Sequence, residues 1–363
     1  MSQQKEQARI YFLDTAKGLA MILVMLGHYT NIPREVNLWL SGFHLPVFFL
    51  VTGMLYSLKN EQTESTKILI RKKIRGILVP YLWFSLITMV WHGIHVAAGR
   101  QPVSLLWNAL LDTVVLRGMG ALWFLPVTLF AQILLILVVK RWGMAKSGVL
   151  FTVLALIGYR CYTFGTGGWI LEESKIGVLY VGEFLIKGLI AACFMCYGGM
   201  LEDFLEKRFD FFSVSTDVRV TGKSRSWILP AAGVLLFGVT FLEIPLGQIR
   251  DLNHLNIGSL PVYLCLGTCG ALGLLILCRY LPECKALTKI GKHSLIIMAT
   301  HVNLPVMAWP MKLGEKLVGI LAITKGAEIF TFAVTMILAL AVEYMLIYLI
   351  PRYMPFLIGK KYR

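Results

Sequence analysis

Long blocks of apolar residues, each about as long as a membrane is thick, restrict the fold of this chain most strongly. A helix needs roughly 20 residues to cross ~30 Å of hydrocarbon, because each residue adds about 1.5 Å. Only 15% of the 363 residues are charged, whereas soluble domains average about 25%. The blocks are continuous rather than alternating, so they favour membrane helices over a membrane β-barrel.

We therefore predict an all-α, polytopic integral membrane bundle with about ten transmembrane helices. A soluble bundle is disfavoured, because its helices would be shorter and amphipathic. The loops are short and no appended soluble domain is apparent, so residues 1–363 are predicted to form a single transmembrane domain. The predicted spans are 11–30, 36–58, 74–98, 119–140, 146–160, 176–201, 225–245, 257–281, 294–311 and 326–351.

The distribution of lysine and arginine predicts the orientation of the bundle. If the N-terminus is cytoplasmic, the inner segments carry 24 of these residues and the outer segments 9. Such residues concentrate on the cytoplasmic side, so both termini and the loops 59–75, 202–225 and 279–293 are predicted to lie inside. We expect a multi-pass protein of the cell membrane (a bacterial inner or plasma membrane), with an uncleaved first span.

The formal net charge of +15 indicates anionic partners at the cytoplasmic face, namely lipid headgroups and any anionic ligand. Nucleic acid is not an expected partner, because no basic soluble domain is present to bind it. Cys193 and Cys196 form a C-x-x-C motif, but within an apolar span, where packing is favoured over redox or metal chemistry. Neither a metal site nor a bound cofactor is expected.

The first span, FLDTAKGLAMILVMLGHYT, contains three ionisable residues, Asp14, Lys17 and His28. Such residues are costly within a membrane and are functional candidates. Eleven residues separate Lys17 from His28, which places them within about 20° of one direction and roughly 16 Å apart along the axis. Asp14 lies on the same stripe, and Gly18 beside Lys17 permits close approach of another group.

Structural readings compete with these functional ones. Asp14 and Lys17 can form an i,i+3 pair with Lys17 reaching the headgroups, and His28 can be an interfacial histidine. All three residues on one stripe favour function. Elsewhere, Glu183 and Lys187 are spaced to neutralise each other. Glu343, in the last span, is a candidate partner for a histidine.

The opening segment RIYFLDTAKGLAMILVMLGH resembles the start of the acyltransferase 3 family, multi-pass proteins that O-acylate extracytoplasmic carbohydrates. Asp14, Lys17, Gly27 and His28 match the family pattern. The basic residue is most often arginine in the family, so Lys17 is a departure. Branches that resemble fucose or O-antigen O-acetyltransferases are similar to this chain at that position.

Further segments resemble the same family in the same order, so the likeness covers most of the chain. FHLPVFFLVTGMLY (43–56) matches through His44, Pro46 and Gly53. The late segment LTKIGKHSLIIMATHVNL (287–304) matches through Gly291, Ser294 and His301. The basic segment KKIRGILVPYLWF (72–84) and the segment ALWFLPVTLF (121–130) complete the set.

The resemblance implies a membrane-bound O-acyltransferase, with an acyl-CoA donor at the cytoplasmic face and a cell-surface or lipid-linked carbohydrate as acceptor. Acetyl is the default acyl group. Lys73 and Arg75 match the family's paired basic positions, and Arg71 lies beside them. A polyanionic CoA headgroup suits these cations, although the loop can also be only a topology signal. A homodimer is compatible with this reading.

The resemblance also assigns catalytic roles. His28 is implied as the general base or as the residue that carries the acyl group. Asp14 lies about 21 Å from His28 along the helix, so it is assigned either to pairing with Lys17 or to the donor end. Additional candidates are His44, His301 and Trp123.

Two alternatives belong to other classes. A transporter or flippase of a glycan or an anionic small molecule would predict inverted repeats or paired broken helices, and the sequence shows neither. The separate class of membrane-bound O-acyltransferases carries an embedded histidine with an upstream asparagine, whereas here the histidine lies in the first span.

Overall fold

A computed structural model describes residues 10–166, 178–212 and 227–360. These residues are helical without a named strand; one isolated bridge joins Asp251 to Asn256. The elements, in order, are α1 (Tyr11–Gly27), α2 (Arg34–Ser41), α3 (His44–Leu58), η1 (Glu61–Thr63), α4 (Thr66–Lys73), η2 (Ile74–Leu78), α5 (Val79–Ala97), α6 (Ser104–Val114), η3 (Gly120–Trp123), α7 (Phe124–Thr166), α8 (Val178–Phe209), α9 (Ile228–Val239), η4 (Thr240–Leu242), α10 (Glu243–Leu246), α11 (Leu260–Tyr280), α12 (Lys285–Lys292), α13 (Ser294–Thr300), α14 (Ala308–Ile320), α15 (Ala327–Tyr353) and η5 (Pro355–Ile358).

The all-α membrane bundle is confirmed, whereas the predicted count of about ten spans is not. Within the described residues, seven helical runs are long and apolar enough to cross a membrane. They are Arg34–Leu58, Thr66–Ala97, Gly120–Gly165, Tyr180–Phe209, Ile228–Leu246, Leu260–Tyr280 and Ala327–Tyr353.

Four predicted spans differ, for three separate reasons. The first, α1, has 17 residues, about 26 Å of helix, which falls short of ~30 Å of hydrocarbon. The predicted span 294–311 is divided, because α13 ends at Thr300 and α14 begins only at Ala308. The predicted spans 119–140 and 146–160 share the single run of α7. Residues 1–9 and 213–225, predicted to be cytoplasmic, lie outside the described residues.

The two predicted spans within α7 are separated by a sharp reversal. Gly143 has φ 77° and ψ 168°, which no right-handed helix contains, and a positive φ favours glycine. Phe130 packs on Gly188 and Gly158 faces Ile186, while Met144 reaches Gly199. Residues on both sides of Gly143 therefore meet the same part of α8, so the two halves run along α8 in opposite directions.

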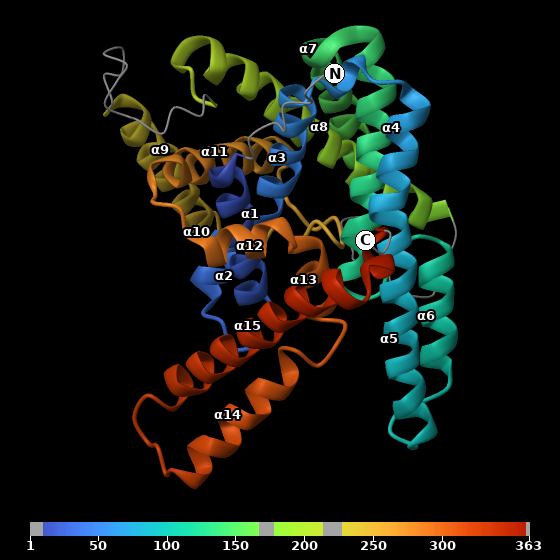
Figure 1. Cartoon of the computed structure of the whole chain (residues 1–363), viewed down its shortest axis with the longest axis vertical. Helices are drawn as coiled ribbons and strands as arrows, with labels where there is room; N and C mark the ends of the chain where they lie inside the picture. The colour runs from blue at the N-terminus through green and yellow to red at the C-terminus, as the bar shows by residue number, and fades with distance from the viewer. Residues whose placement is uncertain (1–9, 167–177, 213–226, 361–363) are drawn as a thin grey trace, which may run out of the picture.

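Close helix crossings build the centre of the bundle, where α1, α3, α8 and α11 gather (Figure 1). A Cβ on Gly291 of α12 would lie 1.8 Å from the Asp14 carbonyl oxygen, and one on Gly18 would lie 2.2 Å from that of Leu287. Real side chains cannot approach so closely. The group that the sequence expected beside Gly18 is therefore the backbone of α12.

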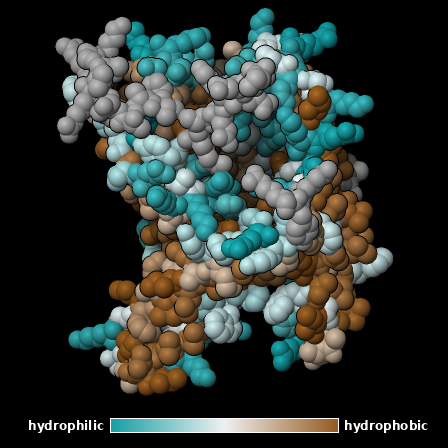
Figure 2. Space-filling model, in the orientation of Figure 1, coloured by the Kyte–Doolittle hydropathy of each residue, from teal (hydrophilic) through white to brown (hydrophobic). Residues whose placement is uncertain are grey.

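Two helix pairs project from this centre. The pair α5–α6 lies on one side, and the pair α14–α15 extends separately (Figure 1). Large apolar side chains are exposed on them, among them Trp107 and Val114 on α6 and Ile329 on α15. Apolar residues gather in this lower half of the view in Figure 2. Surfaces of this kind suit contact with lipid rather than water.

Segments that the sequence assigned to opposite sides of the membrane lie at opposite ends of the bundle. Near the start of α1, the ring of Phe12 contacts Phe211 at 5.3 Å, and Arg279 lies over it at 5.8 Å. At the other end, Arg34 donates to the Gly247 carbonyl at 3.1 Å. We call these the Lys17 end and the His28 end. The assignment of the Lys17 end to the cytoplasm stays a prediction from the charges.

Candidate active site

A pair of histidines marks the His28 end of the bundle. Because α1 ends at Gly27, His28 caps it, and its backbone N–H donates to the Val24 and Met25 carbonyls at 3.2 and 3.1 Å. Its side chain is exposed, and its ring forms no hydrogen bond with the described residues. The ring of His301, which directly follows α13, lies 5.1 Å away at 61°. The structure thus joins two candidates from opposite ends of the chain.

His301 is oriented so that one ring nitrogen is free. The residue is fully buried, and its Nδ1 lies 2.7 Å from the Ile297 carbonyl oxygen. A carbonyl only accepts, so Nδ1 carries the proton, and in the neutral ring Nε2 then has the lone pair. This Nε2 is buried without a hydrogen-bond partner among the described residues. Buried polar atoms are normally satisfied, so Nε2 is suited to accept from a bound hydroxyl.

His44, the third candidate histidine, lies near this pair. It begins α3, is half-buried, and donates from Nδ1 to the Leu40 carbonyl at 2.5 Å. The charges of His44 and His28 are close enough to interact. Three histidines from three separate sequence motifs therefore meet at one end of the bundle.

Asn303, which the sequence analysis missed, holds the segment that carries Trp123. Its amide group donates to the Met119 carbonyl at 2.8 Å, and its carbonyl oxygen accepts from the Ala121 N–H at 3.1 Å. This clamp joins η3 to the chain two residues beyond His301. The signal available in the sequence was only a polar residue within an apolar motif.

Charged side chains, of which Lys187 is buried, adjoin Trp123. Lys187 Nζ lies 5.7 Å from the Trp123 ring centre and 3.4 Å from Glu183 Oε2, which shows the predicted i,i+4 pair. Tyr162 donates to Glu183 at 2.7 Å. The carboxylate of Asp251 interacts electrostatically with both Lys187 and His28. Asp251 lies in a loop, and no pattern in the sequence placed it beside these residues.

Glu343 does not partner a histidine among the described residues, contrary to the sequence-based expectation. It is 1% exposed, and the Thr300 hydroxyl lies 2.8 Å from each of its carboxylate oxygens. Thr300 is the last residue of α13 and directly precedes His301. Glu343 therefore contacts Thr300, the residue before His301, and holds the end of α13 in place.

Asp14 and Lys17 form the predicted ion pair at the opposite end of α1. Lys17 Nζ lies 2.8 Å from Asp14 Oδ1, and the two side chains are 18% and 6% exposed. The close crossing of α12 through Gly291 lies directly against this turn of α1. The pair is thus enclosed by protein rather than extended toward lipid headgroups.

The basic segment at the Lys17 end divides into paired and unpaired cations. Lys73 lies 2.7 Å from a Glu61 oxygen. Arg71 and Arg75 are exposed and form no ion pair with the described residues. Arg75 lies in η2, a π-helical turn, and such turns are frequent at functional sites. The arginines, rather than Lys73, are therefore open to an anionic ligand.

Two further cations, which the sequence analysis did not single out, lie near this segment. Gly359 packs on the Arg75 backbone, which brings the exposed Lys360 to the same end. The charges of Lys360 and Lys292 both act on His293. A basic surface is thus built from three segments that are far apart in the sequence: 71–75, 292–293 and 360.

The described residues contain no group of three or more histidines, cysteines or acids that could hold a metal ion. Cys193 and Cys196 are fully buried in α8.

A family model described as an acyltransferase domain, of the acyltransferase 3 type, matches residues 10–348. The match includes both ends of α1 and the late segment that carries His301. Comparisons with curated proteins and with solved structures gave no match.

Proposed function

The chain belongs to the acyltransferase 3 family, and we propose that it moves an acyl group, by default acetyl, from cytoplasmic acyl-CoA to a hydroxyl of an extracytoplasmic carbohydrate. The observation that carries this proposal is the histidine pair. His28 is exposed beside His301, whose buried Nε2 has no partner among the described residues. An exposed imidazole next to an acceptor nitrogen suits the binding and deprotonation of a hydroxyl.

The chemistry requires that one proton and one acyl group be moved. In the base mechanism, His28 takes the proton of the acceptor hydroxyl while the hydroxyl oxygen bonds to the carbonyl carbon of the thioester. The C–S bond then breaks, and the imidazolium returns the proton to the leaving thiolate. In the carrier mechanism, the neutral ring of His28 first displaces the thiolate, which leaves as the thiol with the ring N–H proton. The acyl-imidazole then transfers the acyl group to the hydroxyl oxygen, and the hydroxyl proton returns to the ring. His301 and His44 position the acceptor and His28 in either case.

The donor is proposed to enter at the Lys17 end. Its phosphates face Arg71 and Arg75, and arginine suits phosphate because its fork forms bidentate hydrogen bonds. Lys292 and Lys360 add charge to the same surface. The ~16 Å that α1 rises between Lys17 and His28 is then bridged by the pantetheine arm, which brings the thioester to the histidines.

The donor site gives a testable prediction. Purified protein is supplied with radiolabelled acetyl-CoA and with surface polysaccharide from a strain that lacks the gene, and label in the polysaccharide is counted. We expect transfer by the unaltered chain. Arg71→Ala with Arg75→Ala should raise the KM for acetyl-CoA on the order of tenfold or more, because charge-assisted hydrogen bonds to the phosphates are lost.

Lys72→Ala is the matched control. Lys72 is exposed in the same helix but lies 2.6 Å from Glu64, so its removal should leave the KM nearly unchanged. If Lys72→Ala changed the KM as much as the double arginine variant did, the segment would act only as a topology signal and not as a donor site. A carrier, the second class of function considered, would leave the polysaccharide without covalent label in every sample.

A further inference from the structure

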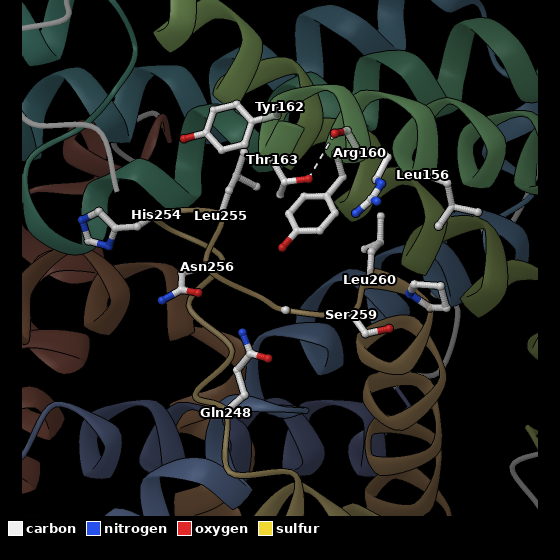
Figure 3. Close-up of a pocket in the computed structure, with 13 residues that line it drawn as sticks. Leu156, Arg160, Tyr162, Thr163, Gln248, His254, Leu255, Asn256, Ser259 and Leu260 are labelled. Atoms are coloured by element: carbon white, nitrogen blue, oxygen red, sulfur yellow. Dashed lines mark hydrogen bonds between the residues drawn. The ribbon is translucent and has the colours of Figure 1, made fainter. Parts of the chain in front are cut away.

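A cavity of about 700 Å³ opens beside the loop 247–259 at the His28 end (Figure 3). The end of α7, this loop and the first turn of α11 form its walls. Its size lies within the range of about 300–1,000 Å³ that is typical of small-molecule sites. None of its lining residues belongs to the motifs that carried the family resemblance.

The walls of the cavity are rich in hydrogen-bonding side chains. Gln248 and Asn256 line the cavity from the loop, and Arg160 and Thr163 line it from the end of α7 above (Figure 3). His254 lies at one edge of it. Planar amides can both donate to and accept from neighbouring hydroxyl groups at fixed spacing, and a guanidinium donates to them. An apolar ligand would leave these groups unpaired.

The loop that supplies these amides is held rigidly. Arg250 is buried, donates from Nε to Glu243 at 2.9 Å and from Nη1 to the Ile257 carbonyl at 2.6 Å, and its backbone N–H donates to Ser41 at 3.0 Å. These bonds tie both ends of the loop to the bundle. Rigid placement lowers the entropy that a ligand would otherwise have to overcome.

The same loop connects the cavity to the histidine pair. Asp251 Oδ2 lies 2.6 Å from His254 Nδ1, and this hydrogen bond raises the pKa of His254. The charge of Asp251 also acts on His28. On the α7 wall, Tyr162 bonds to Glu183, the partner of Lys187. A molecule in the cavity therefore lies next to the charged residues that surround the active site.

We propose that this cavity binds a sugar unit of the acceptor glycan, through Gln248, Asn256 and Arg160, and so presents a neighbouring unit to His28. The proposal rests on the proposed function for the identity of the ligand, but it makes its own claim about binding. The amides and the arginine bond to ring hydroxyls, and the rigid loop fixes the distance from the bound unit to the histidines.

Direct binding tests the proposal. The full chain in lipid nanodiscs is titrated with methyl glycosides of glucose, galactose, fucose, N-acetylglucosamine and glucuronic acid, and saturation-transfer NMR measures each Kd. We expect at least one glycoside to bind the unaltered chain. Gln248→Ala with Asn256→Ala should weaken its binding roughly tenfold, as expected for two or more lost hydrogen bonds.

Asn253→Ala is the matched control, because Asn253 belongs to the same loop, does not line the cavity and holds Asp251 only through its backbone N–H. The Asn253→Ala chain should bind the glycoside with the same Kd as the unaltered chain. Binding of no glycoside, or equal binding by the double variant, overturns the cavity assignment even where acyl transfer is observed. Weakened binding without any acyl transfer would support the cavity as a sugar site and contradict the proposed reaction.

Discussion

Replacement of His28 by alanine should abolish acyl transfer while the protein still inserts and folds. Loss of a general base typically slows a reaction about 10²–10⁴-fold, and loss of an acyl carrier should slow it further. His301 does not replace it, because His301 is assigned to position the acceptor from a fully buried site, whereas His28 is exposed. The variant should remain folded, since the ring of His28 forms no hydrogen bond with the described residues.

The measurement is the rate of label transfer from acetyl-CoA at equal amounts of folded protein. His95→Ala is the control, because His95 lies in α5 against Trp91 and is not part of the site. Its rate should match that of the unaltered chain. If His28→Ala transferred label at a near-normal rate, the histidine pair would have a structural role, and the proposed mechanism would be wrong even though the chain belongs to the family.

Replacement of Gly291 by valine should prevent stable folding of the bundle. Its Cβ would lie 1.8 Å from the Asp14 carbonyl oxygen and 2.8 Å from the Gly18 backbone nitrogen. Both atoms belong to backbone, so no side-chain rotation relieves the clash, and α12 must move away from α1. Overpacking costs typically about 1–3 kcal/mol, and a clash with several backbone atoms of α1 should exceed that range.

Fluorescence-detected size exclusion and thermal unfolding in detergent measure the loss. Gly93→Ala is the matched control: Gly93 lies inside α5, and an added Cβ meets nothing within 4 Å. There alanine should be neutral or slightly stabilising, because it suits a helix better than glycine. Equal midpoints for Gly291→Val and the unaltered protein would contradict the close crossing of α1 and α12.

Apolar blocks and motif order predicted much of the fold, because the length and composition of a segment are enough to identify a membrane helix. The errors arose where tertiary contacts decide. The segment 294–311 is apolar enough for one span, yet it breaks after Thr300, whose hydroxyl bonds to Glu343 of α15. Sequence also separated the two halves of α7 correctly, but it could not show that they fold back upon each other along α8.

The sequence suggested candidate members of the site but not most of their contacts. Periodicity along one helix placed Asp14, Lys17 and His28 on a stripe, and the Asp14–Lys17 pair is observed. The approach of His301 to His28 depends on long-range packing, which no local pattern encodes. For the same reason, the pairing of Lys73 with Glu61 could not be read from the density of cations.

Sidedness tests the central claim, transfer of an acyl group from one face of the membrane to an acceptor on the other. Inverted vesicles and right-side-out vesicles are loaded with surface polysaccharide, and radiolabelled acetyl-CoA is added outside both. We expect labelled polysaccharide inside inverted vesicles, where the Lys17 end faces the added donor, and none in right-side-out vesicles. Label only in right-side-out vesicles, or in neither, would contradict the account.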